Sequence, residues 1–383
     1  MPGIELSPGF SAELASNVYL IKDEFTRKGF KLKYKDSFEI ASDSMVEGKT
    51  GGYIINKKHI MAFLSIGKGK YKGQAFVAIK GTASLYDALT DLNAGIHSSH
   101  TGFPVHQGFY YAFNSMLHDL KRFISGLQGV SVVHCVGHSL GGAIATLAAD
   151  WIKANSGVSA VRLYTFGSPR VGLESFAQKS TSRLIADNIY RVCHSTDPVP
   201  MVPTWPFFHV PTTSAAYVID KPLAIKPWEY HLMKHYIKST EKAGDWGQLR
   251  SFIAAGQPDS AIERWLKSDS IIVSMTAKVL DWINSAVMYV IKKIMKAAGI
   301  VLVTGAAVTL TLLDRLAMFM AKGVKLVSDL SIWVFYLVKK MAQLIGMKVE
   351  EGADLSYSLI RFIFLRLHRK ISDMIWRIGQ EVT

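Results

Sequence analysis

The sequence predicts an α/β fold, a sheet flanked by helices, followed by an all-helical, hydrophobic C-terminal region. From Gly52 onward, short apolar runs of strand length alternate with longer segments of helical periodicity. One of the runs ends in a glycine-rich turn that leads directly into a helical pattern. After residue 256, long apolar stretches punctuated by lysines replace the short runs. The first two observations indicate a sheet with crossover helices, and the third indicates a second unit.

The α/β part is predicted from periodicity, element by element. Leu14, Val18 and Ile21 lie at helical spacing in the opening segment, so we expect a helix there. The expected strands share short β-rich runs, and they cover residues 53–55, 60–66, 75–79, 130–136, 161–166 and 189–193. The two clearest helical patterns between the later strands cover residues 109–127 and 140–154.

The length and a change in composition predict two units. A chain of 383 residues is two to three times the usual domain length. Glycines and a proline interrupt the pattern near residues 243–258, so we expect one unit over residues 1–256 and another over 257–383.

Net charge narrows the class of partner. The chain has 44 basic and 30 acidic residues, a formal net charge of +14, and 49% of its residues are hydrophobic. Such a surface suits nucleic acid, anionic lipid or an acidic protein. We find no RNA-binding module, no zinc-finger spacing and no phosphate-cradling glycine loop, and therefore expect no nucleic acid, no metal and no cofactor. Membrane lipid is then the favoured anionic partner.

The cysteines and the N-terminal residues indicate in which cellular compartment the protein is made and whether it is exported. Cys135 and Cys193 lie in separate strand-like runs with a third run between them, too far apart for a disulfide, so we expect two buried free thiols. Residues 1–20 have no basic start and no continuous apolar stretch, so we expect no secretory signal. Synthesis in the cytoplasm and export by another route would follow.

The strongest chemical signal is Gly137-His138-Ser139-Leu140-Gly141 between a predicted strand and a predicted helix. A serine on such a turn is held out at the end of the sheet, and small neighbours let strand and helix approach. The helix that begins at Leu140 directs free backbone N–H groups toward the same point, which favours an oxyanion. The pattern predicts that Ser139 is a nucleophile.

Such a serine needs a base, and the base needs a carboxylate that fixes its tautomer. Asp197 follows the predicted strand 189–193 and is held by two nearby prolines, so we predict that it is this carboxylate. His209, His231 and His235 are the candidate bases after it. His231 and His235 are one helical turn apart, and the residues alone leave the choice between these two open.

Three linked motifs resemble the class 3, fungal lipase-like lipase family. They are the segment 137–143, Thr-Phe-Gly-Ser-Pro-Arg-Val-Gly at 165–172, and Arg-Val-Cys-His-Ser-Thr-Asp-Pro-Val-Pro at 191–200. The resemblance covers roughly residues 50–240 and implies an α/β-hydrolase-type fold with a mixed central sheet. It also favours His231 as the base, because His231, Met233 and Tyr236 match a His-x-Met-x-x-Tyr pattern of bacterial members.

The same resemblance implies the remaining parts of the site. Thr82, with the N–H of Leu140, corresponds to the oxyanion hole, although Lys80 stands where the family more often has arginine. Asp91 resembles a supporting acid, with a plain surface residue as the alternative. The segment 84–92 resembles a lid whose apolar face covers the site in water, and an ordinary packed helix is the alternative reading.

The predicted activity is hydrolysis of acyl esters of membrane lipids by a serine esterase or lipase. A phospholipase of the A1 type, acting as a toxin effector, best fits the basic net charge and the hydrophobic C-terminal region, residues 257–383, called the tail below. The alternatives are a resident membrane-associated triacylglycerol lipase and a membrane-perturbing or pore-forming protein with a secondary hydrolase activity. The resemblance to bacterial antibacterial effectors implies export by a contact-dependent secretion machine, action at a membrane, an immunity protein, and a carrier or chaperone.

The region 257–383 is expected to bind a membrane or a partner protein. Its longest uncharged run, residues 297–313, would form a helix about 26 Å long, marginal for a hydrocarbon core of about 30 Å. Charges interrupt the neighbouring stretches, which favours amphipathic helices in a headgroup layer. The alternative is a helical bundle packed against the lipase-like unit or a partner.

Overall fold

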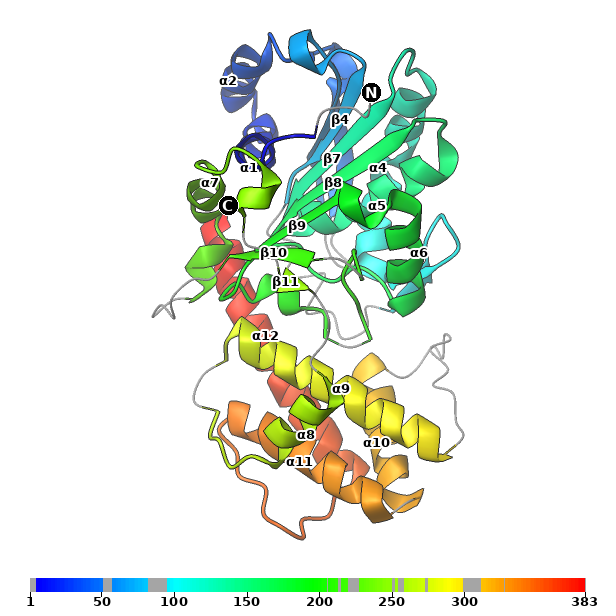
Figure 1. Cartoon of the computed structure of the whole chain (residues 1–383), viewed down its shortest axis with the longest axis vertical. Helices are drawn as coiled ribbons and strands as arrows, with labels where there is room; N and C mark the ends of the chain where they lie inside the picture. The colour runs from blue at the N-terminus through cyan, green and yellow to red at the C-terminus, as the bar shows by residue number, and fades with distance from the viewer. Residues whose placement is uncertain are drawn as a thin grey trace.

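The computed structural model describes residues 5–50, 57–81, 95–204, 206–212, 215–219, 227–249, 252–253, 258–272, 275–298, 311–326 and 328–382. Within them, a mixed sheet has the order β1-β3-β4-β7-β8-β9-β10-β11, with β2 paired to β3 (Figure 1). Its strands are β1 (Phe38–Glu39), β2 (Met45–Thr50), β3 (Lys57–Gly67), β4 (Gln74–Ile79), β7 (Val132–His138), β8 (Ala160–Phe166), β9 (Ile189–His194), β10 (Ala215–Ile219) and β11 (Phe252–Ile253). Strands β4, β7, β8, β9 and β10 run parallel, so their C-terminal ends meet at one edge.

Helices cover both faces of this sheet. Helices α4 (Gln107–Ser125), α5 (Leu140–Asn155) and α6 (Glu174–Leu184) lie on one face, and α1 (Pro8–Asn17), α2 (Glu24–Tyr34) and α7 (Met233–Thr240) lie on the other (Figure 1). Two buried apolar clusters follow this division, one containing α4 and α5 and the other containing α1, α2 and α7. A ribbon of β5 (Ile96–Ser98) and β6 (Pro104–His106) precedes α4. The predicted α/β class with flanking helices is confirmed.

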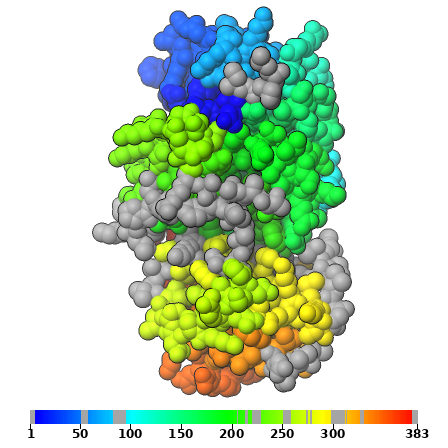
Figure 2. Space-filling model, in the orientation of Figure 1, coloured from blue at the N-terminus to red at the C-terminus, as the bar shows by residue number. Residues whose placement is uncertain are grey.

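A layer of helices follows the sheet. It contains α8 (Asp259–Lys267), α9 (Ala277–Ala298), α10 (Leu312–Leu326), α11 (Ser328–Leu344) and α12 (Tyr357–Val382). Their buried apolar side chains join the cluster that contains α4 and α5, so a continuous core links both parts. Helix α9 contacts the short helix η5 (Val199–Met201), and α12 contacts η6 (Pro227–His231). Figure 2 shows the sheet-containing part, in blue to green, at the top of the molecule and the helices of the C-terminal part, in yellow to orange, below it.

The structure covers only part of the region for which the sequence predicted membrane-binding helices. Within the described ranges, no helix is both long and apolar enough to cross a membrane. Residues 299–310, most of the run singled out as a possible span, lie outside the described residues, as does the expected strand 53–55. The packing found for α8–α12 is the alternative that the sequence had left open, a bundle against the sheet-containing part.

The cysteine prediction is confirmed. Cys135 lies on β7 and Cys193 on β9, with β8 between them, and both are buried free thiols. Burial raises the pKa of both thiols, because a thiolate would lose its hydration in the core.

Candidate active site

The proposed nucleophile lies on the turn between β7 and α5. Ser139 has φ 58° and ψ −130°, a backbone conformation that side chains rarely adopt. Close packing holds this turn: a Cβ at Gly137 would lie 2.2 Å from the Gly141 carbonyl oxygen, and one at Gly141 would lie 2.2 Å from the Ile79 oxygen. Only glycine at both positions lets α5 approach β7 and β4 so closely. The strained serine is therefore presented at the C-terminal edge of the sheet.

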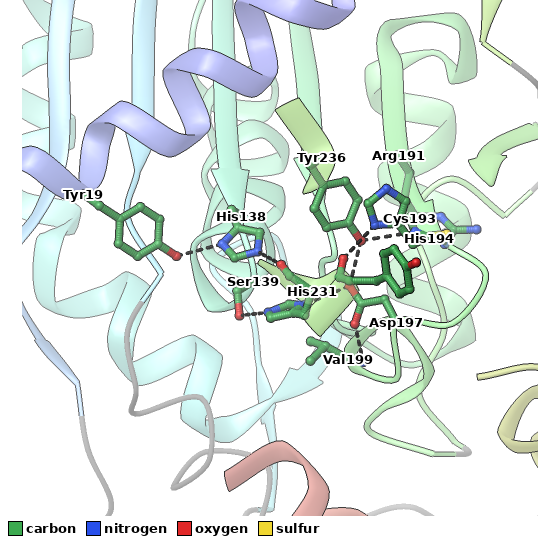
Figure 3. A network of polar contacts seen from close by, with 11 residues as sticks. Tyr19, His138, Ser139, Arg191, Cys193, His194, Asp197, Val199, His231 and Tyr236 are labelled. Carbon is green, nitrogen blue, oxygen red and sulfur yellow. Dashed lines mark hydrogen bonds and ion pairs between the residues drawn. The ribbon is translucent and has the colours of Figure 1, made fainter. Parts of the chain in front are cut away.

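The structure brings Ser139, His231 and Asp197 together (Figure 3). The Nε2 atom of His231 is 2.9 Å from Ser139 Oγ, and its Nδ1 atom is 2.8 Å from Asp197 Oδ2. A carboxylate only accepts, so Nδ1–H donates to Asp197 and Nε2 is left to accept the serine proton. All three side chains are buried, Ser139 being 3% exposed. The order serine, aspartate, histidine along the chain is that of α/β hydrolases.

Three donors surround the Asp197 carboxylate. Besides His231, the Tyr236 hydroxyl donates to Oδ2 at 2.6 Å and the Val199 N–H donates to Oδ1 at 2.9 Å. Burial by itself raises the pKa of Asp197, but the charge of His231 and these hydrogen bonds outweigh it, so the pKa lies below its usual value. Asp197 is thus held ionised and oriented toward His231. The sequence marked Tyr236 only as a motif position and did not reveal its bond to Asp197.

A second chain of hydrogen bonds holds the backbone of His231. The Nε2–H of His138 donates to the His231 carbonyl at 2.8 Å, and the His138 Nδ1 then accepts from the Tyr19 hydroxyl at 2.8 Å (Figure 3). Burial, and next the charge of His231, lower the pKa of His138 to about 3, so its ring is neutral. The Tyr19 hydroxyl also accepts from the Gly81 N–H. These bonds connect the end of β4, the nucleophile turn and the base.

Tyr19 was missed in the sequence because nothing near it forms a motif. It lies on η1 (Val18–Lys22), 119 residues before His138. His134 has no role in the triad: it lies on β7, and its Nε2 bonds to the Gln74 side chain at 2.7 Å within the sheet.

The structure separates the two candidate bases that the sequence left open. His231 belongs to η6, whereas α7 begins at Met233, and Leu232 between them is extended. His231 and His235 therefore do not share one helical face, which corrects the assumption that they do. His235 packs beside the Tyr230 ring, 5.1 Å between centroids, while His231 makes the two bonds to Ser139 and Asp197.

The third histidine and the predicted oxyanion residues are placed only in part. His209 lies beside Pro200, and burial first, then two nearby arginines, hold its pKa well below the usual range. Leu140 is the first residue of α5, so its N–H points out of the helix N-terminus next to Ser139. Thr82, Asp91 and the lid segment 84–92 lie outside the described residues.

The charge near the end of β4 comes from Lys80. It is buried, and burial followed by repulsion from Lys22 lowers its pKa to about 8. In the described part of the chain, no group of histidine, cysteine or acidic residues could hold a metal ion. The geometry as a whole fits nucleophilic attack by a serine on a carbonyl carbon.

Part of the chain is similar to a known family and to several known proteins. Residues 76–207 match the family described as Lipase (class 3). A secreted mono- and diacylglycerol lipase 1 of Fusarium solani is 30% identical over 190 residues, 48% of this chain and 55% of the relative. Toxin TseL of Vibrio cholerae serotype O1 is 37% identical over 118 residues, 30% of this chain and 18% of the relative. Phospholipase A(1) DAD1, chloroplastic, of Arabidopsis thaliana is 29% identical over 150 residues, 33% of each chain.

The chain thus spans about half the length of the Fusarium relative and less of the other two. The matched region contains Ser139 and Asp197, and His231 lies beyond its end. It begins on β4 and reaches into the loop after η5, so it covers the parallel strands that present the site. Over residues 76–207, this chain is therefore similar to the family described as Lipase (class 3).

Proposed function

We propose that this protein hydrolyses acyl esters of membrane lipids with Ser139 as nucleophile, His231 as general base and Asp197 as the carboxylate that orients the base. The observation that carries the proposal is the unbroken set of hydrogen bonds from Ser139 Oγ through His231 to Asp197. Attack transfers the serine proton to His231 Nε2 and forms a tetrahedral intermediate on the substrate carbon. The histidine then protonates the leaving alcohol, and water repeats the sequence on the acyl-enzyme.

The oxyanion of that intermediate needs donors. We assign the N–H of Leu140 and, by resemblance, the N–H and hydroxyl of Thr82 to this role. Losing one such donor costs about 3 kcal/mol of barrier stabilisation. Gly81 ends the described segment before Thr82 and lies against Ser139, since a Cβ there would be 3.3 Å from the Ser139 Cβ. This proximity supports the assignment.

We further propose a phospholipid substrate, cleaved at the sn-1 ester, and a role as a toxin effector exported from the producing bacterium. The basic net charge supports an anionic lipid, and the relatives named as a toxin and as a phospholipase A(1) support the class. A toxin of this kind would require an immunity protein and a carrier or chaperone. Residues 1–256 would form the hydrolase unit and 257–383 a region that contacts it and a membrane or partner.

Neutral glycerides are the second candidate substrates, because the Fusarium relative is named as a mono- and diacylglycerol lipase. The experiment that separates them is product analysis by mass spectrometry after incubation with mixed phospholipids, monoacylglycerol, diacylglycerol and triacylglycerol. We expect 2-acyl lysophospholipid and free fatty acid from the protein and neither from Ser139→Ala. Fatty acid from glycerides alone would transfer the proposal to a glyceride lipase. Undiminished hydrolysis by Ser139→Ala would refute the nucleophile.

A further inference from the structure

Helix α2 has an inward face that is fully used by packing. Asp23 caps its N-terminus by accepting from the Thr26 N–H. Phe30 and Tyr34 point inward, where Phe30 meets Phe63 with 4.9 Å between ring centroids. The apolar contacts that this helix makes with the fold thus come from Phe30 and Tyr34, on its inner face.

The outer face of α2 carries two large apolar side chains in water. Phe25 is 87% exposed and Leu32 is 68% exposed. Seven residues separate them, which is close to two helical turns, so both project on the same side. Gly29 lies between them, and a Cβ there would have no atom within 4 Å, which shows that the face is open. Single exposed apolar residues are ordinary, but an aligned pair on one helix indicates an interaction surface.

Lysines surround this pair. By helical spacing Lys28 and Lys35 lie beside the pair and Lys31 lies at its flank, and all three are exposed. Glu24 is exposed there as well, and residues 22–36 contain six basic and three acidic residues. The Nζ atom of Lys68 donates to the Lys35 carbonyl at 3.1 Å. This bond places a second segment beside the helix end, and its lysines, at 68, 70 and 72, are exposed as well.

We propose that the α2 face, formed by Phe25, Lys28, Lys31, Leu32 and Lys35, docks the protein on an anionic lipid surface. Lysine stems with apolar side chains between them are the composition of helices that lie at a bilayer interface, and each well-placed lysine adds attraction to anionic lipid. Protein interfaces are instead depleted of lysine and enriched in arginine. Every cation on this face is lysine, which favours lipid over a protein partner.

A short segment links the docking face to the catalytic site. Helix α2 begins five residues after Tyr19, whose hydroxyl contacts His138 beside Ser139. Five residues span at most about 17 Å. The α2 segment also lies at the periphery of the molecule, where a flat surface can reach it (Figures 1 and 2). The inference rests on the proposed function only in that a membrane-lipid substrate gives the docking its use.

The test is flotation of the full chain with vesicles of phosphatidylcholine containing about 30% phosphatidylglycerol. All proteins carry Ser139→Ala, so that binding is measured without hydrolysis and a failure of binding is separate from a failure of catalysis. One variant adds Phe25→Ser and Leu32→Ser. A second adds glutamate at the three lysines of the face, Lys28→Glu, Lys31→Glu and Lys35→Glu.

Matched controls carry the same changes elsewhere. Ile271, 77% exposed on a loop outside α2, is changed to serine. The scattered exposed residues Lys121, Lys179 and Lys348 are changed to glutamate, which gives the same net charge as the second variant. We expect both face variants to lose at least tenfold in the floated fraction, and the controls to stay within twofold of the parent.

Each other result overturns the proposal. Face variants that float like their controls would exclude α2 as the docking surface. A loss on charge reversal without a loss in the serine variant would indicate attraction of the whole basic protein and no apolar contact. Equal flotation on pure phosphatidylcholine would exclude anionic lipid, and no flotation of the parent would leave a protein as the occupant. In proteins that retain Ser139, both face variants should hydrolyse a soluble butyrate ester at the parent rate.

Discussion

Replacing Tyr19 by phenylalanine removes one hydroxyl that two parts of the site share. That hydroxyl donates to His138 Nδ1 at 2.8 Å and accepts from the Gly81 N–H. Without it, the buried ring nitrogen of His138 lacks a donor, which costs about 1–3 kcal/mol. His138 holds the His231 carbonyl through its other nitrogen, so part of this cost reaches the base. If about 1.4 kcal/mol of it falls on the transition state, kcat drops about tenfold.

The assay is hydrolysis of a soluble short-chain ester, with kcat and KM measured separately and corrected for the folded fraction. We expect kcat to fall about tenfold and KM to stay nearly constant, because Tyr19 acts through His138 on the orientation of His231 and not on substrate binding. Tyr34→Phe is the matched control. Its hydroxyl accepts from the Asn17 side chain at 3.0 Å and has no bond to the site, so its loss should lower stability by about 1 kcal/mol with kcat unchanged. Equal kcat values in the two variants would refute the positioning role of Tyr19.

Other predictions concern stability. Burial lowers the pKa of His106 to about 4 and those of His134 and His138 to about 3, from an unfolded value near 6.5. The unfolded chain therefore binds protons that the folded chain does not, so stability is full above pH 6.5 and falls by up to about 4 kcal/mol per pH unit below it. Urea midpoints at pH 7, 6 and 5 test this, and equal midpoints would contradict it. Gly141→Ala places a Cβ 2.2 Å from a β4 carbonyl oxygen and should lower the free energy of unfolding by about 3 kcal/mol. Gly157→Ala is the control, because a Cβ there has no atom within 4 Å, and its stability should stay within about 1 kcal/mol of the parent. Similar melting temperatures for the two variants would argue against close packing at the turn. Truncation after residue 256 should give aggregated or inactive protein, because α9 packs on η5, next to Asp197, and α12 packs on η6, which contains His231. A soluble truncated protein with full esterase activity would show that the tail is dispensable.

The sequence predicted the sheet and the nucleophile turn because both depend on local chemistry. Apolar runs of strand length mark β4, β7, β8 and β9, and the glycines around Ser139 are required by backbone contacts within that turn. Asp197 could be singled out because it follows a strand and precedes prolines. The sequence spacing of His231 and His235 could not decide between them, because η6 and α7 are separated at Leu232 and no proline or glycine there indicates a helix break.

Contacts between distant segments were beyond the sequence. Tyr19 acts through a hydrogen bond to His138, which is 119 positions away, and hydrophobic periodicity does not predict a contact between such distant residues. An amphipathic helix has the same periodicity whether its apolar side meets lipid or protein, so the packing of α8–α12 against the sheet-containing part could be offered only as an alternative.

The contact between the tail and the acid-bearing loop explains why a boundary in composition is not a boundary in function. Arg170 lies in the motif 165–172, is buried, and donates to the carbonyls of Met201 and Pro203 at 2.6 and 3.3 Å. Its other nitrogen is 3.6 Å from Asp281 of α9. Burial first, and repulsion from Arg191 as well, lower the pKa of Arg170 to about 10, and the Asp281 carboxylate opposes that shift. The tail therefore supplies a counter-charge for an arginine that bonds to the loop after Asp197.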